Sequence, residues 1–81
     1  MTKEHSITIY STPICPYCVQ LKNYLKEQGF KYTDIDVSRD HKKAEEMIEK
    51  SGQMGVPVAD IDGQIVIGFN KEKVKKLLSI K

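Results

Sequence analysis

Within residues 6–37 the spacing of apolar residues changes from the alternation typical of a strand to the spacing typical of a helix, and then back to alternation. This pattern restricts the fold more than any other feature of the chain. Residues 6–10 alternate and are rich in β-branched and aromatic side chains, which predicts a strand. From Pro16 the apolar residues recur at helical spacing, and Gly29 is suited to a left-handed helix end. Residues 30–37 alternate again, as in a half-buried strand. Because crossovers between parallel strands are right-handed, the sequence predicts a parallel β-α-β unit.

A second helix is expected after this unit. Ser38 or Asp40 can cap its start, and the serine and glycine at residues 51–52 can end it. The Lys and Glu residues of this segment are expected to face water. The apolar residues expected to face the core are Ala44, Met47 and Ile48.

The last third of the chain predicts a hairpin and a final helix. Residues 56–61 and 64–67 are expected to form antiparallel strands joined by Asp62-Gly63, a pair that tolerates positive φ angles. Asn70 can cap a helix whose apolar stripe is Val74, Leu77 and Leu78. The predicted order is therefore β-α-β-α-β-β-α, an α/β fold in which helices cover both faces of a four-stranded mixed sheet.

Length and charge restrict the classes of protein to which the chain can belong. Its 81 residues can build one core, so we expect residues 1–81 to form a single domain. The 13 basic and 11 acidic residues leave a net charge of +2 that is spread over several segments, which argues against a nucleic-acid partner. No apolar run approaches the roughly 18 residues of a membrane span, and Met1–Ser6 lacks the features of a secretory signal. We therefore expect a monomeric cytoplasmic protein without a membrane partner.

The two cysteines lie where the first strand has ended and the first helix begins, in the stretch Cys15-Pro16-Tyr17-Cys18. A sulfur at a helix N-terminus faces unsatisfied backbone N–H groups and the positive end of the helix dipole, which favours the reactive thiolate. Pro16 suits the first helical position, where its missing N–H costs nothing. The helical spacing brings Cys18 to the same face as Cys15, where it can attack a mixed disulfide formed by Cys15. The pattern predicts a redox pair, with Cys15 as nucleophile and Cys18 as resolving cysteine.

Other uses of the pair stay open on sequence grounds. A zinc site needs about four ligands, and the further candidates are His5, in an expected N-terminal tail, and His41, at a helix start. Two inert buried thiols are another explanation, although their placement around Pro16 favours reactivity. A metal-binding or redox-sensing adaptor that uses the same cysteines is the alternative to an enzyme. We expect no metal site and no bound cofactor, because the two sulfurs can hold the electrons.

The Cys-Pro-Tyr-Cys motif and the chain as a whole resemble the dithiol glutaredoxins, a branch of the thioredoxin superfamily. The resemblance spans nearly all of the chain. It implies a thioredoxin fold and an enzyme that reduces protein disulfides and glutathione mixed disulfides. It also implies glutathione as a co-substrate and disulfide-containing proteins as partners.

The resemblance includes Gly55-Val56-Pro57 before the third strand, which is similar to the glutaredoxin loop that carries a cis proline beside the active cysteines. From the residues alone, a trans Pro57 on an edge strand is the commoner arrangement. If the bond is cis, the backbone of Val56 is exposed as a strip that can pair with a substrate peptide or with glutathione. Tyr17, between the two cysteines, is also expected to contact the substrate.

Two positions depart from the glutaredoxin pattern. Gly68-Phe69-Asn70 lies where glutaredoxins usually carry a Gly-Gly pair and an acidic residue that hold the glutamyl end of glutathione. Asn70 and the following helix start could still bind a carboxylate, and a plain turn and helix cap is the other explanation. Ser11 stands where many glutaredoxins have a lysine that helps to bind glutathione. Gly68-Phe69 also resembles the redoxins that feed ribonucleotide reductase and are recharged by thioredoxin reductase, so glutathione and thioredoxin reductase are both candidate reductants.

The remaining aromatic residues and Lys22 are expected to have structural positions. Lys22 lies one helical turn beyond Cys18, where it could affect the local potential, although a solvated lysine is the expected state. The aromatic residues expected in the core or at its rim are Tyr10, Tyr24, Phe30, Tyr32 and Phe69.

Overall fold

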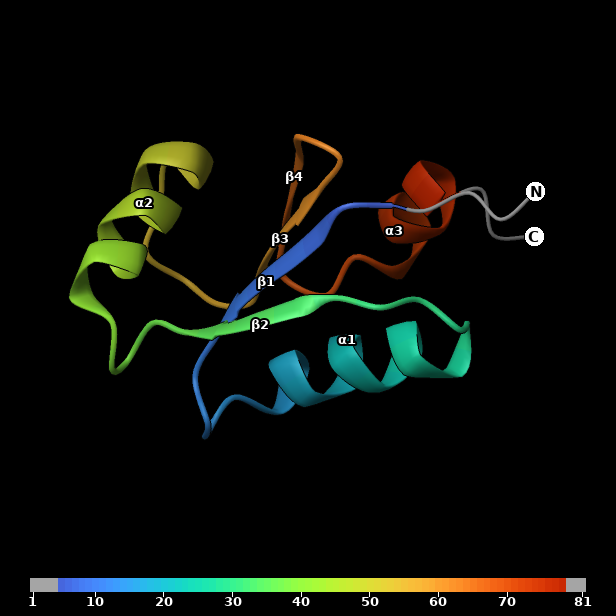
Figure 1. Cartoon of the computed structure of the whole chain (residues 1–81), viewed down its shortest axis with the longest axis horizontal. Helices are drawn as coiled ribbons and strands as arrows, with labels where there is room; N and C mark the ends of the chain where they lie inside the picture. Colours follow the sequence, from blue (N-terminus) through green and yellow to red (C-terminus); the bar gives the residue numbers. More distant parts are fainter. Residues whose placement is uncertain (1–4, 79–81) are drawn as a thin grey trace.

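The sheet has the strand order β2-β1-β3-β4 in the computed structural model, which describes residues 5–78 (Figure 1). The central strand β1 (Ile7–Ser11) pairs in parallel with β2 (Thr33–Asp36) and antiparallel with β3 (Val58–Ile61). β3 in turn pairs antiparallel with β4 (Gln64–Ile67). The predicted order of elements and the mixed sheet are confirmed.

Helices cover both faces of the sheet, as expected. They are α1 (Pro16–Glu27), α2 (His41–Ser51) and α3 (Lys71–Leu78). Side chains of α1 and α3 pack in one core cluster and those of α2 in the other, so α1 and α3 cover one face of the sheet and α2 covers the other. Figure 1 shows α2 and α3 on opposite sides of the hairpin formed by β3 and β4. Within the part of the chain that the structure describes, no helix is long and apolar enough to cross a membrane.

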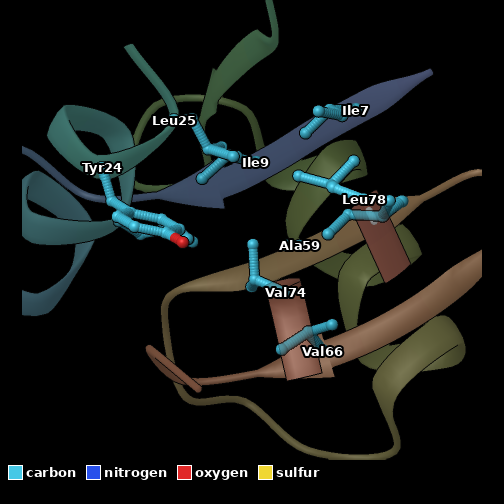
Figure 2. Packing of buried hydrophobic residues seen from close by; sticks show 10 residues of the cluster. Ile7, Ile9, Tyr24, Leu25, Ala59, Val66, Val74 and Leu78 are labelled. Carbon is cyan, nitrogen blue, oxygen red and sulfur yellow. The ribbon is translucent and has the colours of Figure 1, made fainter. Parts of the chain in front are cut away.

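The alternation of side chains along the strands divides the core into two clusters, one on each face. Figure 2 shows the larger cluster, in which side chains from β1, β3 and β4 meet those of α1 and α3. On the other face Tyr10, Val58 and Met47 join the sheet to α2. The buried members of the larger cluster are Ile7, Ile9, Leu21, Tyr24, Leu25, Ala59, Ile61, Val66, Val74 and Leu78.

The cap of α2 and the turn between β3 and β4 form where the sequence predicted them. Asp40, rather than Ser38, caps α2, because its carboxylate accepts a hydrogen bond from the backbone N–H of Lys43 at 3.1 Å. The turn between β3 and β4 has positive φ angles at both central residues, 52° at Asp62 and 89° at Gly63. Phe30, Tyr32 and Phe69 pack against the larger cluster, and Tyr10 and Tyr24 are buried, which confirms the positions expected for the aromatic residues.

Two strands are shorter than expected. β2 covers Thr33–Asp36 and not residues 30–37, because the N–H of Phe30 bonds to the carbonyl of Leu25 and so completes the end of α1. As an edge strand, β2 also leaves Thr33 and its neighbour exposed instead of half-buried. β3 begins at Val58 and not at residue 56, since Pro57 has no N–H for a strand ladder.

His5 lies against the sheet, so the expected N-terminal tail is wrong at this residue. Its Nδ1 is 2.6 Å from a carboxylate oxygen of Asp62, and the other oxygen of Asp62 accepts from the N–H of Ser6 at 2.7 Å. The imidazole ring also meets the ring of Phe30 edge-on, with 5.6 Å between the centroids. The carboxylate in the hairpin turn thus holds the chain that leads into β1.

Candidate active site

The two cysteines lie at the start of α1, beside the end of β1. Cys15 is the N-cap residue of α1, and its sulfur accepts a hydrogen bond from the backbone N–H of Cys18 at 3.3 Å. The same thiol donates toward the carbonyl oxygen of Val56, which is 3.8 Å away. Cys15 is partly accessible, Cys18 is fully buried, and both are free thiols. An accessible sulfur that faces an N–H donor therefore stands next to a buried second thiol.

The surroundings of Cys18 favour its protonated form. Burial raises the pKa of the Cys18 thiol from its ordinary 9.0 to about 11, and the hydrogen bond and charge of Cys15 act in the same direction. The backbone at Thr12 and the ammonium of Lys22 act in the opposite direction. At neutral pH Cys18 thus keeps its proton, which leaves Cys15 as the sulfur positioned to react first.

The proline loop completes the surroundings of Cys15. The bond between Val56 and Pro57 is cis, as the family resemblance implies, and it places the Val56 carbonyl beside the sulfur. Pro57 is buried, and its carbonyl accepts a hydrogen bond from the N–H of Gly68 at 2.8 Å. The structure therefore brings together Cys15, Val56, Pro57 and Gly68, which the sequence places in three separate segments.

Phe69 and Asn70 have structural contacts instead of a place at the sulfurs. The Phe69 ring packs against the larger core cluster, with its centroid 6.1 Å from that of Tyr24. The side-chain oxygen of Asn70 accepts from the N–H of Lys73 at 3.2 Å, which is the contact of a helix cap. The expected turn and cap are confirmed, and binding of glutathione by Phe69 or Asn70 stays a prediction.

Exposed apolar side chains surround the accessible sulfur. Ile14 is 90% exposed, Tyr17 is 61% exposed, and Met54, two residues before Val56, is 77% exposed. We call these three residues the apolar rim. The stretches that meet here, residues 11–21, 51–59 and 64–70, contain no Asp, Glu, Lys, Arg or His. In a chain with 30% charged residues these three stretches carry no charge, although the adjoining end of β2 supplies Asp36 opposite Ser11.

Gln53 is a site-supporting residue that the sequence analysis missed. Its side-chain oxygen accepts from the N–H of Gly55 at 2.6 Å, and its amide nitrogen donates to the carbonyl of Gly55 at 2.9 Å. The backbone N–H of Gln53 in turn bonds to the hydroxyl of Ser51 at 3.3 Å. These contacts hold the loop that carries Met54 and Val56. A glutamine two residues before a glycine is too weak a pattern to have predicted them.

Lys22 is not the solvated lysine that was expected. Its side chain is only 20% exposed, and its ammonium nitrogen is 3.0 Å from a carboxylate oxygen of Asp34. The other oxygen of Asp34 accepts from the hydroxyl of Ser11, which is buried, at 2.7 Å. Spacing on the helix indicated that Lys22 lies one turn beyond Cys18, but its ion pair depends on the pairing of β1 with β2, which no local signal reveals.

Potential metal ligands do not gather around the cysteines. Within residues 5–78 no group of three or more His, Cys, Asp or Glu side chains is placed to hold a metal ion. His5 contacts Asp62, and His41 lies 3.4 Å from Glu45 on α2. Neither histidine provides a further ligand at the sulfurs.

The model of the glutaredoxin family matches residues 7–66. The chain belongs to the glutaredoxin family. This glutaredoxin is 50% identical over 72 residues to an uncharacterized glutaredoxin-like 8.6 kDa protein in the rubredoxin operon of Clostridium pasteurianum, covering 89% of this chain and 96% of that one. It is 35% identical over 63 residues to glutaredoxin 3 of Escherichia coli (strain K12), covering 78% of this chain and 76% of that one. Among solved structures, the glutaredoxin-like NrdH-redoxin from Escherichia coli has a TM-score of 0.80 and 28% identity, covering 89% of this chain and 93% of that one.

These similarities confirm the thioredoxin fold and the class of reaction. The glutaredoxin is a thiol–disulfide oxidoreductase, as the cysteine spacing predicted. The NrdH-redoxin from Escherichia coli has a thioredoxin-like activity profile. Membership of the family therefore does not by itself determine the substrates or the reductant of the present glutaredoxin.

Proposed function

We propose that this glutaredoxin reduces protein disulfides and glutathione mixed disulfides by two successive exchanges, with Cys15 as nucleophile and Cys18 as resolving cysteine. The contrast between the two sulfurs carries the proposal. Cys15 is accessible and faces the N–H of Cys18, whereas Cys18 is buried and has a pKa raised to about 11. The accessible sulfur attacks first, and the buried sulfur acts once a substrate is attached.

The two exchanges balance in electrons and protons. The Cys15 thiolate attacks a substrate disulfide, forms a mixed disulfide and releases one substrate thiol. Cys18 then loses its proton and attacks the sulfur of Cys15, and the second substrate thiol leaves with a proton. The substrate gains two electrons, and Cys15 and Cys18 become a disulfide.

Recognition in this proposal uses backbone and apolar contacts. The Val56 strip beside cis Pro57 would pair with the extended backbone that flanks a substrate disulfide. Pro16 and the apolar rim would contact its side chains, because the stretches that carry them contain no charged residue. Gly68 holds the strip through Pro57, and Phe69-Asn70, directly before the start of α3 at Lys71, is where a glutathione carboxylate would bind.

The lack of charged residues in the stretches around Cys15 favours protein disulfides over glutathione as the preferred substrate. Glutathione carries two carboxylates, and cationic side chains or helix N-termini are the groups that hold carboxylates in proteins. A disulfide on a partner protein, of which ribonucleotide reductase is one candidate, needs no such charge. The reaction needs no bound cofactor and no second copy of the chain, and it suits a reducing compartment such as the cytoplasm.

Substitution of each cysteine tests the assigned roles. Cys15→Ser should abolish reduction of both substrate classes. Cys18→Ser should keep the reduction of a glutathione mixed disulfide and should accumulate a covalent adduct with a protein disulfide, visible by mass spectrometry. Equal loss of all activity in the two variants would contradict the roles. Turnover that stops when a chelator is added would favour the alternative of a metal-binding adaptor.

Recharging separates the two candidate reductants. Oxidised protein would be mixed with NADPH and either glutathione plus glutathione reductase or thioredoxin reductase alone, and NADPH consumption would be followed. The lack of charged residues in the stretches around Cys15 predicts faster recharging by thioredoxin reductase. Faster recharging by glutathione would instead assign this chain to the glutathione-linked members of its family.

A further inference from the structure

The ion pair between Lys22 and Asp34 lies one helical turn beyond the resolving cysteine, and the charge of Lys22 acts on its thiol. Lys22 follows Cys18 by one helical turn on α1, so the two side chains share a helix face. Asp34 on β2 holds the ammonium at 3.0 Å, and the hydroxyl of Ser11 at the end of β1 holds the carboxylate at 2.7 Å. Three elements thus fix the position of one cation next to a buried thiol.

This position matters because Cys18 must ionise in a site that opposes ionisation. Burial disfavours the Cys18 thiolate, and so do the hydrogen bond and charge of Cys15. Among the groups that act on the Cys18 thiol, Lys22 is the cation that favours its ionised form. Asp34 faces Lys22 from β2, and the neighbouring stretches of residues 11–21 and 51–59 are uncharged.

The balance of these effects changes during the reaction. While Cys15 is a free thiol or thiolate, its hydrogen bond and its charge both keep Cys18 protonated. After Cys15 enters a mixed disulfide it carries no charge, so its opposition to the Cys18 thiolate is removed. The ammonium of Lys22 remains in place and continues to favour that thiolate.

We propose that Lys22, held by Asp34 and Ser11, is a positioning residue for the resolving step and stabilises the thiolate of Cys18 as it attacks the mixed disulfide. The inference rests on the proposed role of Cys18. In this step Cys18 releases its proton to solvent, its sulfur bonds to that of Cys15, and the bond to the substrate sulfur breaks with its electron pair. The leaving thiolate takes up a proton, so the charge of Lys22 is needed only while the Cys18 thiolate exists.

The test follows both exchanges in one stopped-flow trace with the neutral disulfide 4,4′-dithiodipyridine. Attack by Cys15 releases one thiopyridone, and attack by Cys18 on the resulting adduct releases a second. Lys22→Met should slow the second release about fivefold to tenfold near neutral pH, because one pKa unit is tenfold in thiolate. The first release should change by less than about twofold. The deficit should shrink as the pH rises through the ionisation of Cys18, and Lys22→Arg should restore the rate.

The matched control is Lys26→Met, which removes an exposed lysine one turn further along α1. It should leave both releases as they are in the unchanged protein. A second release that is equally fast in Lys22→Met and Lys26→Met would overturn the inference. The inference would also be overturned if Lys22→Met slowed both releases by the same factor at every pH, because this result indicates a structural effect. If Cys18→Ser still shows the second release, the role of Cys18 itself is wrong, and this outcome is distinct from a failure of Lys22 alone.

Discussion

The backbone N–H of Cys18 points at the sulfur of Cys15, with 3.3 Å between nitrogen and sulfur. In the proposed roles, this contact lets the resolving residue support the nucleophile before it reacts, because an N–H donor stabilises a thiolate. The contact follows from the helix itself, since the N-cap side chain accepts from an N–H in the first turn. The two cysteines are therefore coupled through the backbone, in addition to the disulfide that the proposed reaction forms between them.

The difference in accessibility between these sulfurs predicts selective alkylation. In the reduced native protein, iodoacetamide should modify Cys15 and leave Cys18 free, because Cys18 is fully buried and its pKa is raised to about 11. This rise of about two pKa units reduces the thiolate fraction of Cys18 about a hundredfold at neutral pH. Mass spectrometry of peptides should show one modified cysteine before denaturation and two after it. Preferential labelling of Cys18 in the native protein would contradict this geometry.

The raised pKa of Cys18 also predicts a change of stability in alkali. The unfolded chain loses the Cys18 proton near its ordinary pKa of 9.0, while the folded protein keeps it up to about pH 11. The folded state thus binds more protons between these values, so the free energy of unfolding falls as the pH rises through them. Urea unfolding of the reduced protein should show this fall. In reduced Cys18→Ser, which shares the other titrating groups, the fall should be smaller, and an identical slope would contradict the prediction.

The fold was largely predictable because each helix and most strands bury one face in a hydrophobic cluster, and this leaves a periodic pattern of apolar residues in the sequence. Periodicity indicated the buried stripes of α2 and α3, and the Asp62-Gly63 pair indicated the turn between β3 and β4. Strand ends were harder to predict, since residues 30–32 alternate as a strand does but have no ladder partner. Whether a residue of β2 is buried depends on the edge position of that strand, which only the assembled sheet determines.

The site was predictable only where its chemistry is local. The cysteine pair and Pro16 are contiguous, so spacing alone predicted a helix start with a reactive sulfur. The ion pair of Lys22 with Asp34 depends on the register that sets Asp34 opposite Ile9, and short-range patterns do not contain that register. The orientation of Phe69 toward the core likewise results from packing against Tyr24.

The double contact between Gln53 and Gly55 predicts an effect on protein substrates. Gln53→Ala removes both hydrogen bonds that hold the loop with Met54 and Val56. Ordering this loop on binding would then cost about 1 kcal/mol more, since two exposed hydrogen bonds are lost and each contributes about 0.5 kcal/mol, the low end of the usual range. The value of kcat/KM for a protein disulfide should fall about fivefold. The rate of Cys15 with 4,4′-dithiodipyridine should stay within about twofold, because a small reagent does not use the loop.

Gln64→Ala is the control for this change, because Gln64 is exposed at the start of β4. It should leave kcat/KM for the protein disulfide unchanged. Equal losses for the protein disulfide and for the small reagent in Gln53→Ala would show that the loop acts on the sulfur itself. No loss for either would show that the contact with Gly55 has no part in recognition.

The hydrogen bonds of Tyr10 attach α2 to the sheet, and their loss is expected to lower the stability of the fold. Its buried hydroxyl donates to a carboxylate oxygen of Glu46 at 3.0 Å and accepts from the ammonium of Lys50 at 3.1 Å. Tyr10→Phe should lower the free energy of unfolding by about 1–2 kcal/mol at neutral pH, because hydrogen bonds to charged groups are lost. Tyr17→Phe removes a hydroxyl from an exposed ring and should cost less than about 0.5 kcal/mol.

The pH dependence of the Tyr10→Phe deficit distinguishes this bond from a general packing defect. The Tyr10 hydroxyl is the main cause that holds the pKa of Glu46 below its ordinary 4.5, so it stabilises the folded protein while Glu46 is ionised. That contribution is complete above the ordinary pKa and is lost as the pH falls through the lower value of the folded state. Urea titrations at several pH values should therefore show a deficit that is largest near neutrality and shrinks in acid. A deficit of constant size down to the acid limit would indicate that the phenyl ring packs poorly and that the carboxylate contact contributes little.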